Sequence, residues 1–133
     1  MIYLPDTNVC VAHLRSPDSS VSERFRLHRP EDIALCDIVK AELVYGAYRS
    51  AGTEANLALL TEFFAPFVSL PFDGHAAEVY GRIRREMERT GTVIGPHDLF
   101  IASIALANGL ILVTHNTREF SRVPELTLED WET

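Results

Sequence analysis

Residues 1–9 read MIYLPDTNV, in which a short apolar run, Ile2 to Leu4, is followed by Pro5 and the carboxylate of Asp6. A continuous apolar run of this kind is typical of a strand that is buried on both faces of a parallel sheet. In open parallel sheets, functional sites lie beyond the carboxyl ends of the strands, near the point where the strand order reverses. Asp6 therefore stands where such a sheet would place a site.

The same pattern recurs along the chain and predicts an α/β fold. Besides residues 2–4, apolar runs predict strands over 33–36, 67–70, 110–114 and 126–128. Segments with helical spacing alternate with them, over 9–14, 20–28, 37–50, 54–64, 74–89 and 96–108. This alternation predicts three layers, with a central, mostly parallel sheet of four to five strands and helices on both faces. No repeat or low-complexity segment divides the chain, so we expect residues 1–133 to form one domain.

Composition narrows the class of protein. Cys10 and Cys36 form no CxxC motif, so we expect two free thiols rather than a disulfide framework. No apolar stretch reaches the roughly 20 residues that span a bilayer, and no secretory leader is recognisable, which favours a cytoplasmic protein without membrane contact. Eleven of the twelve basic residues are Arg, which suits phosphate recognition. The net charge of −7 argues against a general nucleic-acid binder, so any phosphate contact must be local.

Two further carboxylates are candidates to join Asp6. Glu42 shares a helical stripe with apolar residues, so its side chain either lies beneath the edge of the sheet or reaches out to solvent. Asp98 follows Pro96 in the first turn of an apolar helix, where an anion either compensates the helix dipole or faces the sheet. Three carboxylates that meet in a partly buried site repel one another unless a cation is present. Oxygen ligands without a Cys/His cluster favour Mg²⁺ or Mn²⁺ over zinc.

Four motifs, in this order, carry a resemblance to a known family that extends along the whole chain: Asp6-Thr7-Asn8, Ala41-Glu42-Leu43, Gly95-Pro96-His97-Asp98, and VTHNTREFSRVPEL with the closing Leu128-Glu129-Asp130-Trp131. Together they resemble a PIN domain and, more narrowly, the VapC toxins of type II toxin–antitoxin systems. The resemblance implies an Mg²⁺- or Mn²⁺-dependent endoribonuclease that forms a homodimer. It also implies inhibition of translation until a VapB-type antitoxin docks against the site. The enteric members of the family suggest that the substrate is initiator tRNA, cut in the anticodon region.

The resemblance also assigns roles to residues of this sequence. Asp6, Glu42 and Asp98 match the acidic triad that binds metal and performs catalysis. The supporting hydroxyl and amide positions, which hold the ligands in place, match Thr7, Asn8 and Thr114.

One departure concerns the fourth acidic position of many PIN domains, which is Asn116 in this chain. Asn116 can offer a carbonyl oxygen to a metal but no charge. Glu119 could complete the site instead if residues 117–120 form a helical turn, and the sequence leaves both possibilities open. Arg118 and Arg122 are candidate RNA contacts, with salt bridges or antitoxin contacts as the alternatives.

Other readings of clustered aspartates fit less well. A receiver domain needs a Lys after its fifth strand, but the single Lys, Lys40, is predicted in a helix. A dehalogenase-type phosphatase needs an Asp where Asn8 stands, and no GK[ST] motif supports a P-loop NTPase. The remaining alternative is a catalytically degenerate PIN-like domain that binds RNA or a partner without cleavage, for which Asn116 is the only support.

Overall fold

The computed structural model describes residues 1–133, and all its strands pair in parallel. One ladder has the order β1 (Tyr3–Pro5), β4 (Ile111–Val113), β5 (Leu128–Glu129), and the other joins β2 (Ala34–Cys36) to β3 (Val68–Leu70). A parallel bridge between Tyr3 and Ile33 links the two ladders, so the strands run in the order β3-β2-β1-β4-β5. The predicted parallel sheet is confirmed, although each strand is only two or three residues long.

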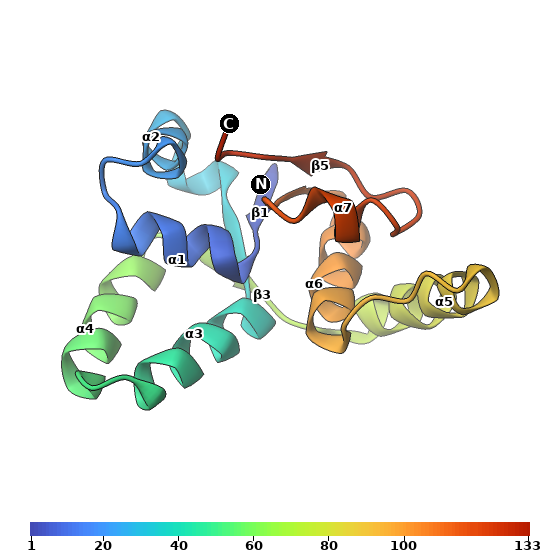
Figure 1. Ribbon diagram of the computed structural model, residues 1–133, viewed down its shortest axis with the longest axis horizontal. Helices are drawn as coiled ribbons and strands as arrows, with labels where there is room; N and C mark the ends of the chain where they lie inside the picture. The colour runs from blue at the N-terminus through green and yellow to red at the C-terminus, as the bar shows by residue number, and fades with distance from the viewer.

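The predicted helices are also present, with ends that differ by one or two residues from the expected ones. They are α1 (Thr7–Arg15), α2 (Ser20–Leu27), α3 (Asp37–Arg49), α4 (Thr53–Phe64), α5 (Gly74–Thr90) and α6 (Pro96–Ala107). A short helix α7 (Thr117–Phe120) and a 3-10 turn (Pro30–Asp32) complete the chain. Figure 1 shows α1 to α4 on one side of β1 and β3, and α5 and α6 on the other. The predicted three-layer α/β fold is therefore confirmed.

The hydrophobic core is built around α6, which is apolar nearly all round. Six of its residues are buried, and the hydroxyl of one of them, Ser103, donates to the Leu99 carbonyl at 2.7 Å. Trp131, near the end of the chain, is fully buried and packs edge-on against Tyr3 and Phe25. This contact fastens the C-terminal segment to the first strand. None of the helices is long and apolar enough to cross a membrane.

The strand order creates a switch point between β1 and β4. The chain runs from β1 to β2 and β3 on one side, and then returns to β4 on the other side of β1. In open parallel sheets, ligand sites lie beyond the carboxyl ends of the strands at such a switch point. Asp6 and Thr114 are the first residues beyond β1 and β4, respectively.

Candidate active site

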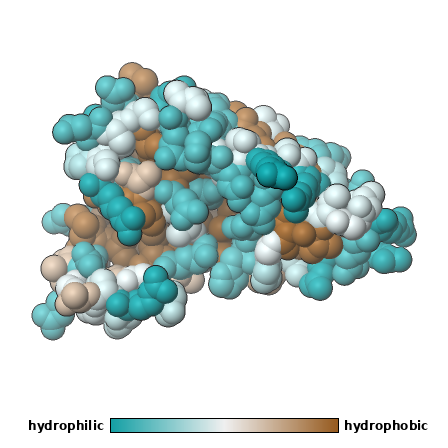
Figure 2. All heavy atoms as spheres, in the orientation of Figure 1, coloured by the Kyte–Doolittle hydropathy of each residue, from teal (hydrophilic) through white to brown (hydrophobic).

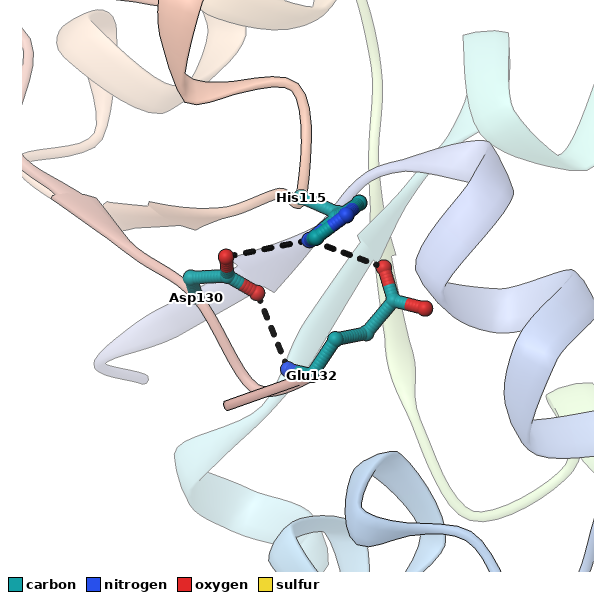
Figure 3. A group of neighbouring side chains, drawn as sticks. All are labelled: His115, Asp130 and Glu132. Atoms are coloured by element: carbon teal, nitrogen blue, oxygen red, sulfur yellow. Dashed lines mark hydrogen bonds and ion pairs between the residues drawn. The ribbon is translucent and has the colours of Figure 1, made fainter.

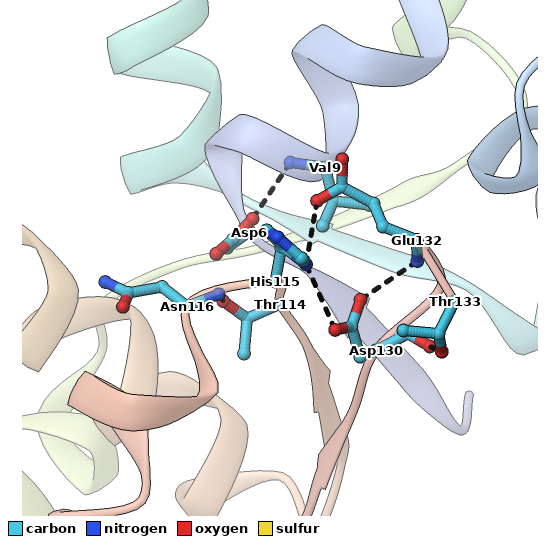
Figure 4. A network of polar contacts seen from close by, with 8 residues as sticks. All are labelled: Asp6, Val9, Thr114, His115, Asn116, Asp130, Glu132 and Thr133. Carbon is cyan, nitrogen blue, oxygen red and sulfur yellow. Dashed lines mark hydrogen bonds and ion pairs between the residues drawn. The ribbon is translucent and has the colours of Figure 1, made fainter.

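Asp6 is held at the end of β1 by its own role as the N-cap of α1. Its Oδ1 accepts a hydrogen bond of 2.9 Å from the backbone N–H of Val9 (Figure 4). A side-chain hydrogen bond from Thr114 also lowers the pKa of the Asp6 carboxyl. Asp6 is 6% exposed. Burial raises the pKa of the Asp6 carboxyl, the two hydrogen bonds oppose that shift, and the charges of Glu132 and Glu42 add to it. The Asp6 carboxylate is thus fixed in position, but its hydrogen bonds do not fully offset the effect of burial on its pKa.

Glu42 lies near the middle of α3 and points toward the same end of the sheet. Its Oε1 accepts a hydrogen bond of 2.5 Å from the Thr7 hydroxyl, and its Oε2 lies 3.4 Å from Nδ1 of His97. With 30% of its side chain exposed, Glu42 does not extend freely into solvent. The Glu42 side chain therefore does not point out into solvent, which was the other orientation considered.

Asp98 lies in the first turn of α6 and is half-buried. Burial raises the pKa of its carboxyl to about 6, and the charges of Glu119, Asp6 and Glu42 act in the same direction. Dipole compensation alone would leave Asp98 in solvent, away from other acids. Its three acidic neighbours come instead from the end of β1, from α3 and from α7.

Glu119 is brought to the site by α7, the helical turn on which its participation depended. Its Oε1 accepts a hydrogen bond of 3.4 Å from the N–H of Gly95, the N-cap of α6, and its proximity helps to raise the pKa of Asp98. The amide of Asn116 donates to the other Glu119 oxygen at 2.6 Å. Glu119 and Asn116 are therefore not alternatives in this structure, because Asn116 orients Glu119.

The other predicted residues are placed differently. Asn8 is exposed on the first turn of α1, and none of the four carboxylates accepts a hydrogen bond from its amide, whereas Thr7 and Thr114 do contact the acids. Arg118 and Arg122 are exposed beside the site, and neither forms an ion pair. Salt bridges were one alternative considered for these two arginines, and the structure contains none.

A groove of about 420 Å³ opens beside this cluster, between α1, α3 and α4. Thr7 and Glu42 line the groove, its apolar lining includes Val11, Leu14, Leu43 and Leu59, and Arg15 and Arg49 also line it. Figure 2 shows hydrophobic side chains gathered where these helices meet. Sequence periodicity did not reveal the groove, because it depends on how three helices are spaced in the fold.

The donor chemistry of the cluster suits a hard divalent cation. Asp6, Glu42, Asp98 and Glu119 supply carboxylate oxygens, and no Cys or Lys of the chain pairs with them. Burial is the main cause of the raised pKa values of Asp6 and Asp98, and the charges of neighbouring carboxylates add to both shifts. A cation bound by oxygen ligands relieves the repulsion between these charges directly.

Comparison with known proteins agrees with this geometry. The family model of the PIN domain matches residues 3–126. A Shigella flexneri protein named tRNA(fMet)-specific endonuclease VapC is 41% identical, over 97% of each chain, and Ribonuclease VapC2 of Rickettsia felis is 41% identical, over 99% of each chain.

Among solved structures, the crystal structure of DNA-bound VapBC from Salmonella typhimurium superposes with a TM-score of 0.93, at 38% identity and over 98% of each chain. VapBC2 of Rickettsia felis, also bound to DNA, gives a TM-score of 0.90 at 38% identity and covers 98% of this chain and 99% of the other. The family resemblance noted in the sequence thus extends to the fold, and the chain belongs to the PIN domain family.

Proposed function

We propose that this protein is a VapC-type endoribonuclease toxin, which hydrolyses phosphodiester bonds in RNA and inhibits translation until a VapB-type antitoxin neutralises it. The observation that carries the proposal is that the charges of Asp6, Glu42 and Glu119, from the end of β1, from α3 and from α7, all help to raise the pKa of Asp98 in α6. The names of its relatives support the same activity, since proteins 41% identical to it are called a tRNA(fMet)-specific endonuclease and a ribonuclease.

PIN-domain ribonucleases generally depend on a divalent metal ion. We propose Mg²⁺ or Mn²⁺ here, because every donor in the cluster is a carboxylate oxygen. Asp6 and Asp98 would be the principal ligands, and Glu42 a ligand or the base. Glu119, oriented by Asn116, would be the fourth acid. When bound, such an ion lowers the pKa of a water molecule and neutralises charge on the scissile phosphate.

The residues of the chain then have separate tasks in the hydrolysis. Glu42, held by Thr7 and His97, accepts the proton of the attacking water, whose oxygen bonds to phosphorus in line with the leaving group. The bond between phosphorus and the 3′ oxygen breaks, and the leaving 3′ oxygen takes up a proton from solvent, so the products carry a 5′-phosphate and a 3′-hydroxyl. Thr114 keeps the Asp6 carboxylate in place. Arg118 and Arg122, which are exposed and have no acidic partner in the chain, would contact the RNA backbone.

For the substrate we propose initiator tRNA, cut in the anticodon region. The support is the name of the Shigella flexneri relative, which aligns with 97% of this chain. Two features reconcile RNA binding with the net charge of −7. Part of the negative charge belongs to the acidic site and would be offset when a cation binds. Arg118 and Arg122 would supply local positive charge beside it.

The partner proposed for the groove between α1, α3 and α4 is a segment of a VapB-type antitoxin. Solved relatives include VapBC complexes at 38% identity. An apolar lining beside the Glu42 carboxylate suits an apolar segment carrying a basic residue, which would also cover the site. The homodimer implied by the resemblance remains a prediction.

A cleavage assay with purified protein and tRNA tests the catalytic part of the proposal. We expect cleavage in Mg²⁺ or Mn²⁺, none in excess EDTA, and a loss of more than about 100-fold in Asp98→Asn, since even residues behind metal ligands cost 10–100-fold. Asp37→Asn is the matched control, because Asp37 is also an acid after a strand but pairs with Ser69. Cleavage that persists in EDTA or in folded Asp98→Asn protein contradicts the metal mechanism.

Sequencing of RNA ends after expression without antitoxin tests the substrate. A discrete new 5′-phosphate end in the anticodon loop of initiator tRNA is expected, and it should be absent with Asp98→Asn. If no new end forms anywhere while the protein still binds RNA, the chain is instead the degenerate binding domain that Asn116 suggested.

A further inference from the structure

A second cluster of ionisable side chains lies beyond the ends of β4 and β5 and has no task in the mechanism above. Nδ1 of His115 is 3.1 Å from Oδ2 of Asp130 and 3.3 Å from Oε2 of Glu132 (Figure 3). One atom from each residue fits within a spread of 4.8 Å. Two carboxylates thus share a single ring nitrogen, which carries at most one proton.

The three side chains are held together by the fold, although Asp130 and Glu132 lie near the end of the chain. The backbone N–H of Thr114 donates to the Glu129 carbonyl at 2.9 Å, which places the residues after β4 and β5 side by side. Trp131, between the two acids, is fully buried, and its indole N–H donates to the Glu129 carboxylate at 2.9 Å. The N–H of Glu132 donates to Oδ1 of Asp130 at 2.9 Å, so Oδ2 remains available (Figure 4).

The two nitrogen–oxygen spacings in this cluster are close to those of ligands around a small metal ion, and all three atoms lie within 4.8 Å of one another. Nitrogen and oxygen ligands about 2.0–2.2 Å from a tetrahedral zinc ion stand about 3.3–3.6 Å apart. The two nitrogen–oxygen distances, 3.1 and 3.3 Å, are close to that range. Side-chain exposure of 64% at His115 and 37% at Glu132 lets an ion enter and leaves room for a water ligand.

A divalent ion would neutralise this cluster, whereas a single proton does not. Two carboxylates and an imidazolium sum to −1, whereas the same carboxylates with a neutral imidazole and a divalent cation sum to zero. An imidazole ligand also selects zinc-like metals over Mg²⁺, unlike the carboxylates around Asp98. We propose that His115, Asp130 and Glu132 form a separate binding site for Zn²⁺, in which Nδ1 releases its proton to solvent and binds the ion.

The site would act next to the catalytic carboxylates without being part of them. The negative charge of Glu132 is felt at the Asp6 carboxyl. An ion bound by Glu132 would reduce that charge. It would also link the C-terminal turn to His115, which follows Thr114. The inference does not depend on the proposed ribonuclease activity, because it concerns other side chains and another class of metal.

Calorimetric titration with Zn²⁺ alone tests the site. The background protein carries Asp98→Asn and Glu119→Gln, which removes two carboxylates from the catalytic cluster. This protein is expected to bind one Zn²⁺ ion, and adding His115→Gln should weaken binding at least tenfold. His75→Gln is the matched control, since His75 is an exposed histidine at the start of α5, and it should leave the affinity unchanged.

A second measurement uses the wild-type chain, so that no variant needs to fold. Zn²⁺ should shift the NMR resonance of the Nδ1 nitrogen of His115 more than that of its Nε2 or of any His75 nitrogen. Absence of Zn²⁺ binding in the background protein, equal binding after His115→Gln, or an unshifted His115 would each overturn the proposal. Cleavage of RNA is not read in either experiment, so failure here is distinct from failure of the ribonuclease assignment.

Discussion

The carboxyl groups of Asp6 and Asp98 show, at the scale of single residues, how the fold keeps charge where burial disfavours it. The pKa of both groups is raised, chiefly by desolvation. Hydrogen bonds from Val9 and Thr114 hold Asp6 in its charged form in part, whereas the nearby charge of Glu119 further raises the pKa of Asp98. Substitution at these positions should therefore separate stability from activity.

Without metal, Asp98→Asn should stabilise the protein at neutral pH although it abolishes cleavage. The pKa of this carboxyl rises from 3.8 to about 6 on folding, so between these values the native state binds more protons than the unfolded state. The stability of the wild type relative to Asp98→Asn is therefore greatest below about pH 4 and is lost as the pH rises through about 6. Urea unfolding of both proteins in EDTA, from pH 4 to pH 7.5, measures the difference. A difference that is independent of pH would show that the Asp98 charge costs the fold nothing.

Thr114→Val should weaken metal binding without removing a ligand. The buried hydroxyl donates to Asp6, and residues that orient a metal ligand typically contribute 10–100-fold to affinity. We expect a fall of that order in Mn²⁺ affinity, measured by calorimetry, while kcat recovers at saturating metal. Thr61→Val, at an exposed position of α4, is the control. Unchanged Mn²⁺ affinity in Thr114→Val would mean that Asp6 needs no such support.

At the scale of elements, two features of the site depend on short or separate helices. The four-residue helix α7 is anchored by Phe120, its one buried side chain, which turns Glu119 toward the N-terminus of α6. An anion at that end of a helix is favoured by the free N–H groups and the helix dipole. The groove, in turn, exists because α1, α3 and α4 leave their apolar faces partly uncovered.

Leu59→Asp should separate antitoxin binding from catalysis. Leu59 lines the groove from α4, is 46% exposed and contacts no catalytic carboxylate. A charge there would be desolvated by a bound apolar segment, so we expect at least tenfold weaker retention of a coexpressed VapB-type antitoxin with normal RNA cleavage. The control, Leu27→Asp, changes a 77% exposed leucine in α2 outside the groove. Equal retention by the two variants would place the antitoxin elsewhere.

For the whole molecule, the proposed metal site predicts that stability depends on divalent ions. If Mg²⁺ or Mn²⁺ binds only the folded chain, an ion at 100 times its dissociation constant adds about 2.7 kcal/mol to the free energy of unfolding. We expect a rise in Tm with either ion in the wild type, read by circular dichroism. The double variant Asp6→Asn/Asp98→Asn should show no rise. An equal rise in both proteins would assign the effect to ions bound elsewhere.

The sequence by itself determined the elements, the parallel sheet and the position of Asp6 at the end of the first strand. Those features follow from local patterns, namely apolar runs, helical spacing and Pro or Gly at the joints, and the helix ends differ from prediction by only one or two residues. The motifs around Asp6, Glu42 and Asp98 could likewise be recognised in the sequence.

Only the tertiary structure decided what meets at the switch point. Glu119 joins Asp98 because α7 packs through Phe120, Asn8 turns to solvent, and His115 meets Asp130 and Glu132 because β4 pairs with β5 and Trp131 is buried. Contacts between residues far apart in sequence depend on packing and strand register, which no short window of sequence contains. The chemistry of single residues was therefore visible in the sequence, and their assembly into two separate clusters was not.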